Sequence, residues 1–182
     1  MIDVFTKYLV AVALPDQLAR RVVDALLHRW LLIFGAPRRI LSDQAVNFES
    51  AVFANLSMSW RIEKVRTSSY HPACNGVCER VNQTIKKGLS KSLNEENLEN
   101  WDEALPNVVF AYNTSVHTAT GFFLYYLMFG TEARVPSEII IGLPPLEKTP
   151  ASFAFWRYKQ LEVIYQVVRD NISVMQKHSK DL

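Results

Sequence analysis

The feature that most constrains the fold is an alternation of short apolar runs with a helical repeat in the first 65 residues. Residues 9–14 and 39–42 are short, apolar and typical of strands. Between them we expect a helix that opens at residues 15–16 and ends at Gly35. Its apolar residues recur at spacings of three and four, as on a helix with one buried face: Ala19, Val22, Val23, Leu26, Leu27 and Trp30. This order of strand, helix and strand predicts an α/β fold.

The rest of the chain continues the pattern and ends in helices. We expect a short helix over 50–56, a strand over 62–65 and a loop over 67–76, because that loop is rich in Ser, Pro, Asn and Gly. Longer helices are predicted over 77–93, 101–112 and 153–177, with a proline-rich linker over 143–150. The helix over 77–93 should bury one face, which consists of Val81, Ile85, Leu89 and Leu93. We therefore predict one domain over residues 1–146, followed over 147–182 by a linker and a C-terminal helix.

Composition limits the function classes. Apolar residues make up 49% of the chain, which argues against a disordered tail. The net charge of +2 does not by itself indicate nucleic-acid binding, so such a function must rest on local patches. His71, Cys74 and Cys78 could suggest a metal site, but a closed zinc site needs four ligands, and two small side chains at the start of a helix are the simpler interpretation. No apolar run is long enough for a membrane span and no basic segment follows Met1, so we expect an intracellular protein.

Two carboxylates are candidates for chemistry. Asp43 directly follows the strand over 39–42, and Glu79 is expected in the first turn of the next long helix, with 35 residues between them. Each has an ordinary explanation by itself. An aspartate after a strand usually stabilises a turn, and a glutamate in a first helical turn complements the helix dipole.

The segments around these carboxylates match known motifs. Residues 42–48 (SDQAVNF) resemble the SDQGxxF segment of gypsy-type integrases, and residues 71–80 (HPACNGVCER) resemble their HPxxxGxxER segment. The 35-residue gap matches the Asp-x35-Glu signature of that family. Further matches lie in order along the chain, at residues 3–8 (DVFTKY), 34–37 (FGAP), 101–103 (WDE), 110–115 (FAYNTS) and 129–130 (FG). Residues 1–146 thus resemble the integrase catalytic core of retroviruses and gypsy-type LTR retrotransposons.

The resemblance implies a ribonuclease-H-like mixed sheet with flanking helices, in which three carboxylates bind two Mg²⁺ (or Mn²⁺) ions about 4 Å apart. Such integrases cut and join DNA, and Asp43 and Glu79 match the second and third carboxylates. The first lies in a W-x-x-D stretch upstream of the point where this sequence begins, whereas Asp3 matches a non-catalytic aspartate. We therefore expect a core without the first strand and most of the second, poor ion binding, and no activity by this chain alone.

The resemblance also suggests contacts with DNA. Gln83 and Lys86 lie four and seven residues after Glu79 on the same helix face, which tracks the DNA end in related integrases. A solvated helix face is the alternative, and the resemblance favours a phosphate contact by Lys86. Tyr70 and Asn75 lie before Glu79, where relatives contact the DNA terminus, and an ordinary role in a turn stays equally open.

Three interpretations follow from these residues. The first is a fragment of a DNA-integrating polynucleotidyl transferase, nuclear if functional, with the element ends and target DNA as partners. The second is a domesticated, non-catalytic integrase-like protein that binds DNA or protein. The third is an interaction module that uses the last helix. Each is compatible with a homo-oligomer and none involves a membrane.

Overall fold

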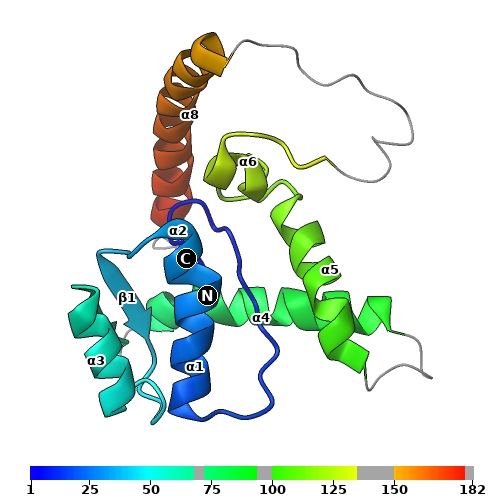
Figure 1. The fold of residues 1–182 in the computed structure, drawn as a ribbon. Coiled ribbons are helices and arrows are strands. Elements are labelled where there is room, and N and C mark those ends of the chain that lie inside the picture. The colour runs from blue at the N-terminus through cyan, green and yellow to red at the C-terminus, as the bar shows by residue number, and fades with distance from the viewer. Residues whose placement is uncertain (68–71, 94–99, 135–149, 179–182) are drawn as a thin grey trace. The chain divides into compact units, whose positions relative to one another are not determined.

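The computed structural model describes residues 1–67, 72–93, 100–134 and 150–178 of the chain (Figure 1). The chain divides into two compact units. One consists of Met1 and Val10–Val109, and the other of Ile2–Leu9 and Phe110–Leu182. The segment Ile2–Leu9 therefore belongs with the C-terminal part of the chain.

The first unit is a helix-rich α/β arrangement around a small parallel sheet. Its core contains Leu31 and Phe53, which are 2% and 1% exposed, packed with Val23, Leu26, Trp30 and Ile62. The elements, in chain order, are α1 (Ala19–Leu26), η1 (Leu27–Leu31), α2 (Leu32–Phe34), β1 (Arg39–Ser42), α3 (Ala51–Ser59), β2 (Glu63–Arg66), α4 (Pro72–Ser92) and most of α5 (Trp101–Asn113).

The predicted helix after residue 15 is confirmed as α1, η1 and α2, which follow one another without a break. Asp16 stabilises its start, because its carboxylate accepts a hydrogen bond from the backbone N–H of Leu18 (3.1 Å) and pairs with Arg21 (2.9 Å). The helix ends at Gly35, whose φ of 84° lies in the region that favours glycine. In the middle, η1 is a π-helical turn that carries the buried Trp30 and Leu31.

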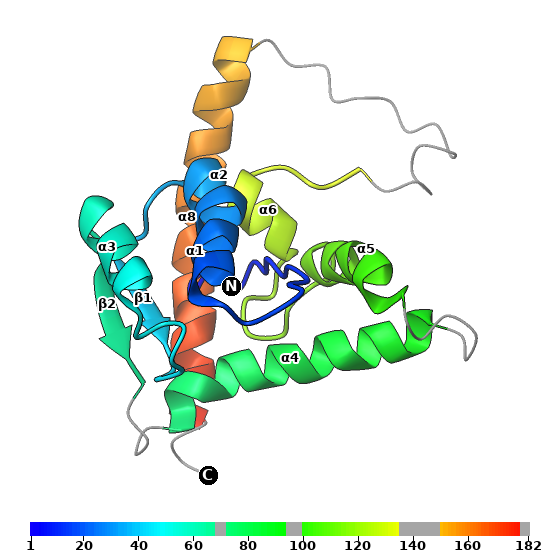
Figure 2. The same ribbon diagram turned by 60° about the horizontal axis from the view of Figure 1, so that its bottom comes forward.

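The sheet confirms the α/β fold class. β1 and β2 pair in parallel, with a register that runs from Arg39 opposite Glu63 to Ser42 opposite Arg66. Figure 2 shows these two strands side by side next to α3. The predicted strand over 9–14 is wrong, because this stretch forms only an isolated antiparallel bridge, between Ile2 and Leu9. The backbone of Leu9 is engaged instead by the side-chain amide of Asn113.

The predicted loop over 67–76 is also wrong in its second half. α4 begins at Pro72, so Glu79 lies about two turns inside the helix rather than in its first turn, and Asn75 lies within the helix. Proline suits the first helical turn, because its missing N–H would have no partner there and its ring fixes a helical φ. The composition of this segment suggested a loop, but α4 continues through Gly76.

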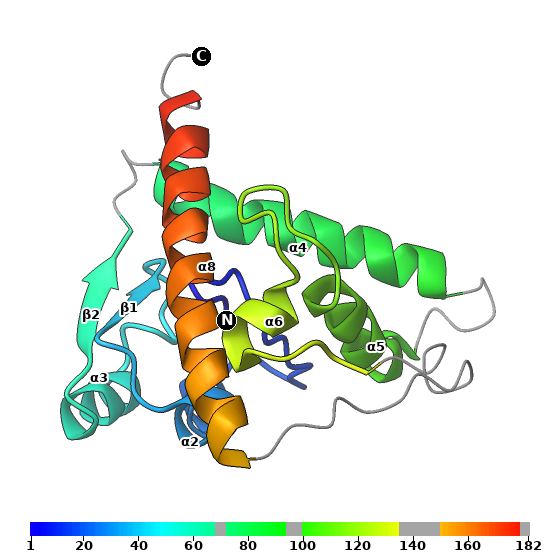
Figure 3. The ribbon, with the colours of Figure 1, turned by 90° about the horizontal axis from the view of Figure 1, so that it is seen from above.

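The second unit contains the end of α5 and two further helices. α6 (Leu124–Phe129) was not predicted, and it ends at Gly130 with a left-handed φ of 68°. The predicted C-terminal helix is confirmed as α8 (Pro150–His178). α6 and α8 lie side by side (Figure 3), where the Tyr165 hydroxyl donates to the Leu127 carbonyl at 2.8 Å. None of the helices in the described ranges is both long enough and apolar enough to cross a membrane.

Candidate active site and nucleic-acid interface

Asp43 is the first residue after β1, and the backbone around it is fixed locally. The hydroxyl of the buried Ser42 donates to the Asp43 carbonyl at 3.0 Å. The Asp43 carboxylate accepts a hydrogen bond from the Ala45 N–H at 3.2 Å, which closes a short side-chain turn. Asp43 is exposed, so its carboxylate is open to solvent at the end of the strand.

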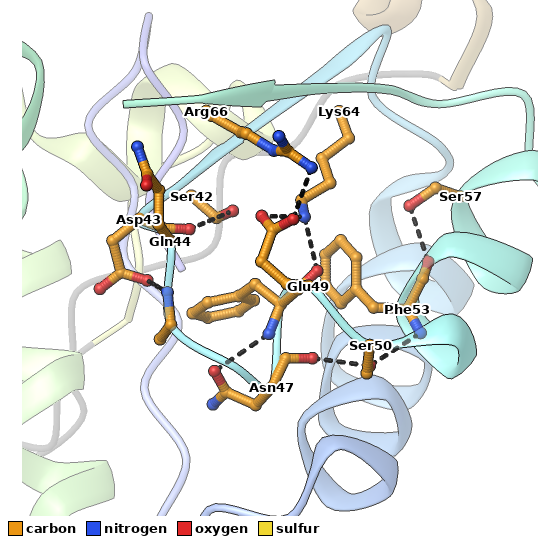
Figure 4. A network of polar contacts seen from close by, with 12 residues as sticks. Ser42, Asp43, Gln44, Asn47, Glu49, Ser50, Phe53, Ser57, Lys64 and Arg66 are labelled. Carbon is orange, nitrogen blue, oxygen red and sulfur yellow. Dashed lines mark hydrogen bonds and ion pairs between the residues drawn. The ribbon is translucent and has the colours of Figure 1, made fainter. Parts of the chain in front are cut away.

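The loop that follows, residues 43–50, is joined to β2 by polar contacts (Figure 4). The Gln44 side chain donates to the Thr67 carbonyl at 3.1 Å. Near the other end of the loop, Glu49 accepts hydrogen bonds from Lys64 and Arg66, both at 2.6 Å. These contacts lower the pKa of Glu49, chiefly through the hydrogen bond from Lys64, with the positive charge of Arg66 adding to it. Sequence reasoning did not identify this network, although the alternation of Lys64 and Arg66 along a strand was a signal for it.

Glu79 lies on the exposed side of α4. Gln83 and Lys86 are exposed as well, whereas Val81 and Ile85 are buried. The helix therefore separates a polar side from an apolar side, as the spacing of these residues predicts. Leu89 and Leu93, which were expected on the buried face, are only half-buried. Asn75 lies in α4, and Tyr70 lies outside the described residues.

α4 approaches α5 closely at one point in the first unit. A Cβ atom placed on Gly88 would lie 2.5 Å from the Cγ1 of Val108, which is closer than real side-chain contacts. Glycine at this position thus lets the two helices come this close. The exposed side, with Glu79, faces away from the apolar contacts.

Asp3 has a structural role in the second unit. Its carboxylate accepts hydrogen bonds from the N–H and the hydroxyl of Thr6, at 2.6 and 2.7 Å. These bonds shape a turn in which Lys7 adopts a φ of 64°.

Potential metal ligands do not cluster in the part of the chain that the structure describes. No three or more His, Cys, Asp or Glu side chains come together there in a way that could hold a metal ion. Asp43 and Glu79 are the two carboxylates that the sequence motifs single out, and carboxylate oxygens are the ligands that Mg²⁺ prefers. Cys78 is exposed, and His71, its partner in the alternative metal grouping, lies outside the described residues.

Comparison with known sequences finds integrase-related proteins. The chain is 31% identical to the human gypsy retrotransposon integrase-like protein 1 over 136 residues, 75% of this chain and 26% of that protein. It is 22% identical to the retrovirus-related Pol polyprotein from transposon 412 of Drosophila melanogaster over 178 residues, 97% of this chain and 14% of that protein. The chain thus spans about a quarter or less of the length of these relatives. No protein-family model matches it.

Solved integrase structures share the fold. The catalytic core domain of HTLV-2 integrase, in complex with magnesium, superposes with a TM-score of 0.58 at 22% identity, over 70% of this chain and 80% of that one. The simian T-cell lymphotropic virus intasome, in complex with a PP2A regulatory subunit, gives a TM-score of 0.61 at 23% identity, over 82% of this chain and 50% of that one. The chain is therefore a homologue of retroviral and retrotransposon Pol polyproteins and of gypsy integrase-like proteins, with the ribonuclease-H-like fold of an integrase catalytic core.

Proposed function

We propose that this chain is the DNA-binding core of an integrase-like polynucleotidyl transferase, and that DNA lies along the exposed side of α4. The observation that carries the proposal is the arrangement of this helix, which exposes Glu79, Gln83 and Lys86 while it buries Val81 and Ile85. A carboxylate suited to phosphodiester chemistry and a cation suited to phosphate thus share one surface. The homology to integrase-like proteins supports the same conclusion.

The binding we propose is electrostatic. Lys86 is exposed on α4, and Lys87 and Lys91 extend the positive charge along the same helix. A lysine that neutralises a DNA phosphate releases a condensed counterion, so affinity falls as the salt concentration rises. Contacts of this kind do not read base sequence. We therefore expect salt-sensitive binding that differs little between unrelated duplexes.

The test of DNA binding is a salt titration of fluorescence anisotropy with two unrelated duplexes. Lys86→Ala should weaken binding to both duplexes to a similar degree and reduce the slope of log K against log salt by about one. Arg20→Ala is the matched control, because Arg20 is an exposed cation on α1. An unchanged slope in Lys86→Ala would contradict the proposed surface.

For the chemistry, we propose that Asp43 and Glu79 are two of the carboxylates of the catalytic site. Mg²⁺ is the ion of the family, as in the HTLV-2 integrase core, and it would activate the attacking oxygen and stabilise the leaving one. With Asp43 and Glu79 as two of the family's three carboxylates, we expect the 182-residue chain alone to show no DNA cutting or joining in Mg²⁺ or Mn²⁺. Joining that disappears in Asp43→Asn would disprove this expectation.

The second candidate is a non-catalytic DNA- or protein-binding role, and the observation behind it is that no three His, Cys, Asp or Glu side chains group together among the described residues. The two candidates differ in one measurement. If DNA binding persists without any metal-dependent joining when the chain is supplied with further integrase segments, the non-catalytic role holds.

A DNA-handling role of either kind would place the protein in the nucleus. Sedimentation with and without duplex would test whether two or more copies assemble on DNA.

A further inference from the structure

One carboxylate joins the loop that carries Asp43 to the second strand. The Oε1 of Glu49 accepts from the Lys64 Nζ and the Oε2 accepts from the Arg66 Nη2, each at 2.6 Å. Lys64 and Arg66 are two residues apart on β2, so their side chains point to the same face and reach the same acceptor. The two oxygens of one carboxylate are thus held by two cations, which fixes the carboxylate in both position and orientation.

The Lys64 side chain also contacts the backbone of the loop. Its Nζ donates to the Phe48 carbonyl at 2.6 Å and lies 5.5 Å from the centre of the Phe53 ring. The Lys64 side chain is 18% exposed and that of Glu49 is 28% exposed, so this pair is less screened by water than a surface pair. The Arg66 side chain, at 65%, is much more open to solvent.

A short series of hydrogen bonds runs from Glu49 back to Asp43. The backbone N–H groups of Phe48 and Glu49 both donate to the Ala45 carbonyl, at 2.9 and 3.2 Å. The Ala45 N–H donates in turn to the Asp43 carboxylate. These bonds link Asp43 and Glu49 through Ala45, and Figure 4 shows the side chains of both residues at this loop. A shift of Glu49 would therefore be transmitted to Asp43 through a single intervening residue.

We infer that Glu49 is a positioning residue for Asp43, and that its ion pairs with Lys64 and Arg66 fix the place of the Asp43 carboxylate at the end of β1. The inference rests on the proposed function, in which Asp43 is one of the site's carboxylates. Because charge maintains this contact, protonation of Glu49 releases it. The charged groups that face Glu49 are Lys64 and Arg66 from β2, and its neighbour on α3 is the uncharged ring of Phe53.

The test measures backbone order at Asp43 and Ala45 by ¹⁵N relaxation in the full 182-residue chain. In the wild type, both amides should have order parameters near the rigid value of about 0.85. Glu49→Gln should lower them to about 0.6 or less, while the amides of α3 keep their order. Glu63→Gln is the matched control. Glu63 lies on β2, the strand of Lys64 and Arg66, and its carboxylate pairs with Arg39 at 2.7 Å rather than with the loop. It should leave Asp43 and Ala45 unchanged.

A pH profile separates positioning from a general contribution to folding. Since Lys64 and Arg66 lower the pKa of Glu49, the loop should keep its order above the ordinary glutamate range and lose it as acid protonates Glu49. Glu49→Gln should abolish this step, Glu63→Gln should retain it, and Glu49→Asp should restore part of the order because it keeps the charge. If Glu49→Gln does not fold, Arg66→Gln removes one exposed partner and should show a smaller loss.

The outcomes distinguish the inference from the proposed function. Unchanged order at Asp43 and Ala45 in both Glu49→Gln and Arg66→Gln would overturn the positioning role. Loss of order in Glu49→Gln supports it, whatever the DNA-binding result. Failure of Lys86→Ala to alter DNA binding would instead count against the proposed function and leave the role of Glu49 in the loop intact.

Discussion

The loop after β1 and the segment around Leu9 are both held by side chains, but by opposite physical means. In the first unit, residues 43–50 are held by the charges of Glu49, Lys64 and Arg66 near the surface. In the second unit, Leu9 is held by the neutral amide of Asn113, which is 2% exposed. Its Oδ1 accepts from the Leu9 N–H at 2.9 Å and its Nδ2 donates to the Leu9 carbonyl at 2.8 Å.

The difference matters because the two kinds of contact respond to different conditions. The ion pairs of Glu49 are lost on protonation, and salt screens the more exposed one with Arg66, so the loop of Asp43 is adjustable. A buried amide that satisfies both backbone groups of another residue is insensitive to salt and pH. Removal of that amide would leave two buried polar groups without partners. The second unit therefore depends on a permanent contact, whereas the proposed site depends on a reversible one.

The largest expected effect is at Asn113. Asn113→Leu removes both hydrogen bonds and leaves the buried N–H and carbonyl of Leu9 unpaired, at about 1–3 kcal/mol for each group. We expect a loss of about 3 kcal/mol or more in the free energy of unfolding, measured by urea denaturation followed by circular dichroism. Thr114→Ala is the control, because the Thr114 hydroxyl donates to carbonyls of the preceding turn, such as that of Phe110, rather than to Leu9. A loss below about 1 kcal/mol would show that the Leu9 contact is dispensable.

The contact between Asn113 and Leu9 helps to explain which elements could be predicted from the sequence and which could not. The helix over residues 19–34 was predictable because its signals are local, namely apolar spacing and the glycine at its end, and β1 was predictable from its short apolar run. The absence of a strand over 9–14 was not predictable, because Leu9 is engaged by a residue 104 positions away. The start of α4 was misplaced because Pro72 and Gly76 are common in loops as well as tolerated in a first turn and inside a helix.

The candidate site divides in the same way. Asp43 and Glu79 were identified by motif and spacing, and their exposed positions suit the roles proposed for them. Glu49 was not identified, since a glutamate in a loop has no distinctive pattern of its own, and the signal from Lys64 and Arg66 on β2 does not say which carboxylate they meet. The exposed polar side of α4 was predictable from the helical period alone, because that period places Glu79, Gln83 and Lys86 on one side of the helix.

An effect of intermediate size on the free energy of unfolding is expected from pH. It should appear at acid pH in the first unit and at alkaline pH in the second. In the first unit, backbone and Arg21 contacts lower the pKa of Asp16, and Lys64 lowers that of Glu49. These groups stabilise the fold above their unfolded pKa values, near 4, and that stability is lost as pH falls through the lower folded values. In the second unit, burial raises the pKa of Tyr8 and Tyr165. Their contribution is present below about pH 10 and is lost as pH rises through the higher folded values.

The measurement is the free energy of unfolding in urea at a series of pH values, followed by a spectroscopic signal from each unit. Asp16→Asn combined with Glu49→Gln should flatten the acid side of the profile and leave the alkaline side unchanged. Tyr8→Phe combined with Tyr165→Phe should reduce the alkaline loss and leave the acid side as it is. If either pair alters both sides equally, the contrast between a charge-held and a neutrally held unit is wrong.

The smallest expected effect, and one of opposite sign, is at Tyr112 on α5. Its hydroxyl is buried and has no hydrogen-bond partner in the described part of the chain, and burial raises its pKa. The ring packs edge-on near His117, with 6.5 Å between ring centres. Tyr112→Phe keeps the ring and removes a polar atom that is desolvated without compensation, so we expect a gain of up to about 1 kcal/mol in the free energy of unfolding. Tyr165→Phe is the matched control, because the Tyr165 hydroxyl donates to the Leu127 carbonyl and its removal should destabilise instead. A loss of stability in Tyr112→Phe similar to that in Tyr165→Phe would mean that the Tyr112 hydroxyl has a partner in solution, and the second unit would then contain one more buried neutral contact of the kind that Asn113 provides.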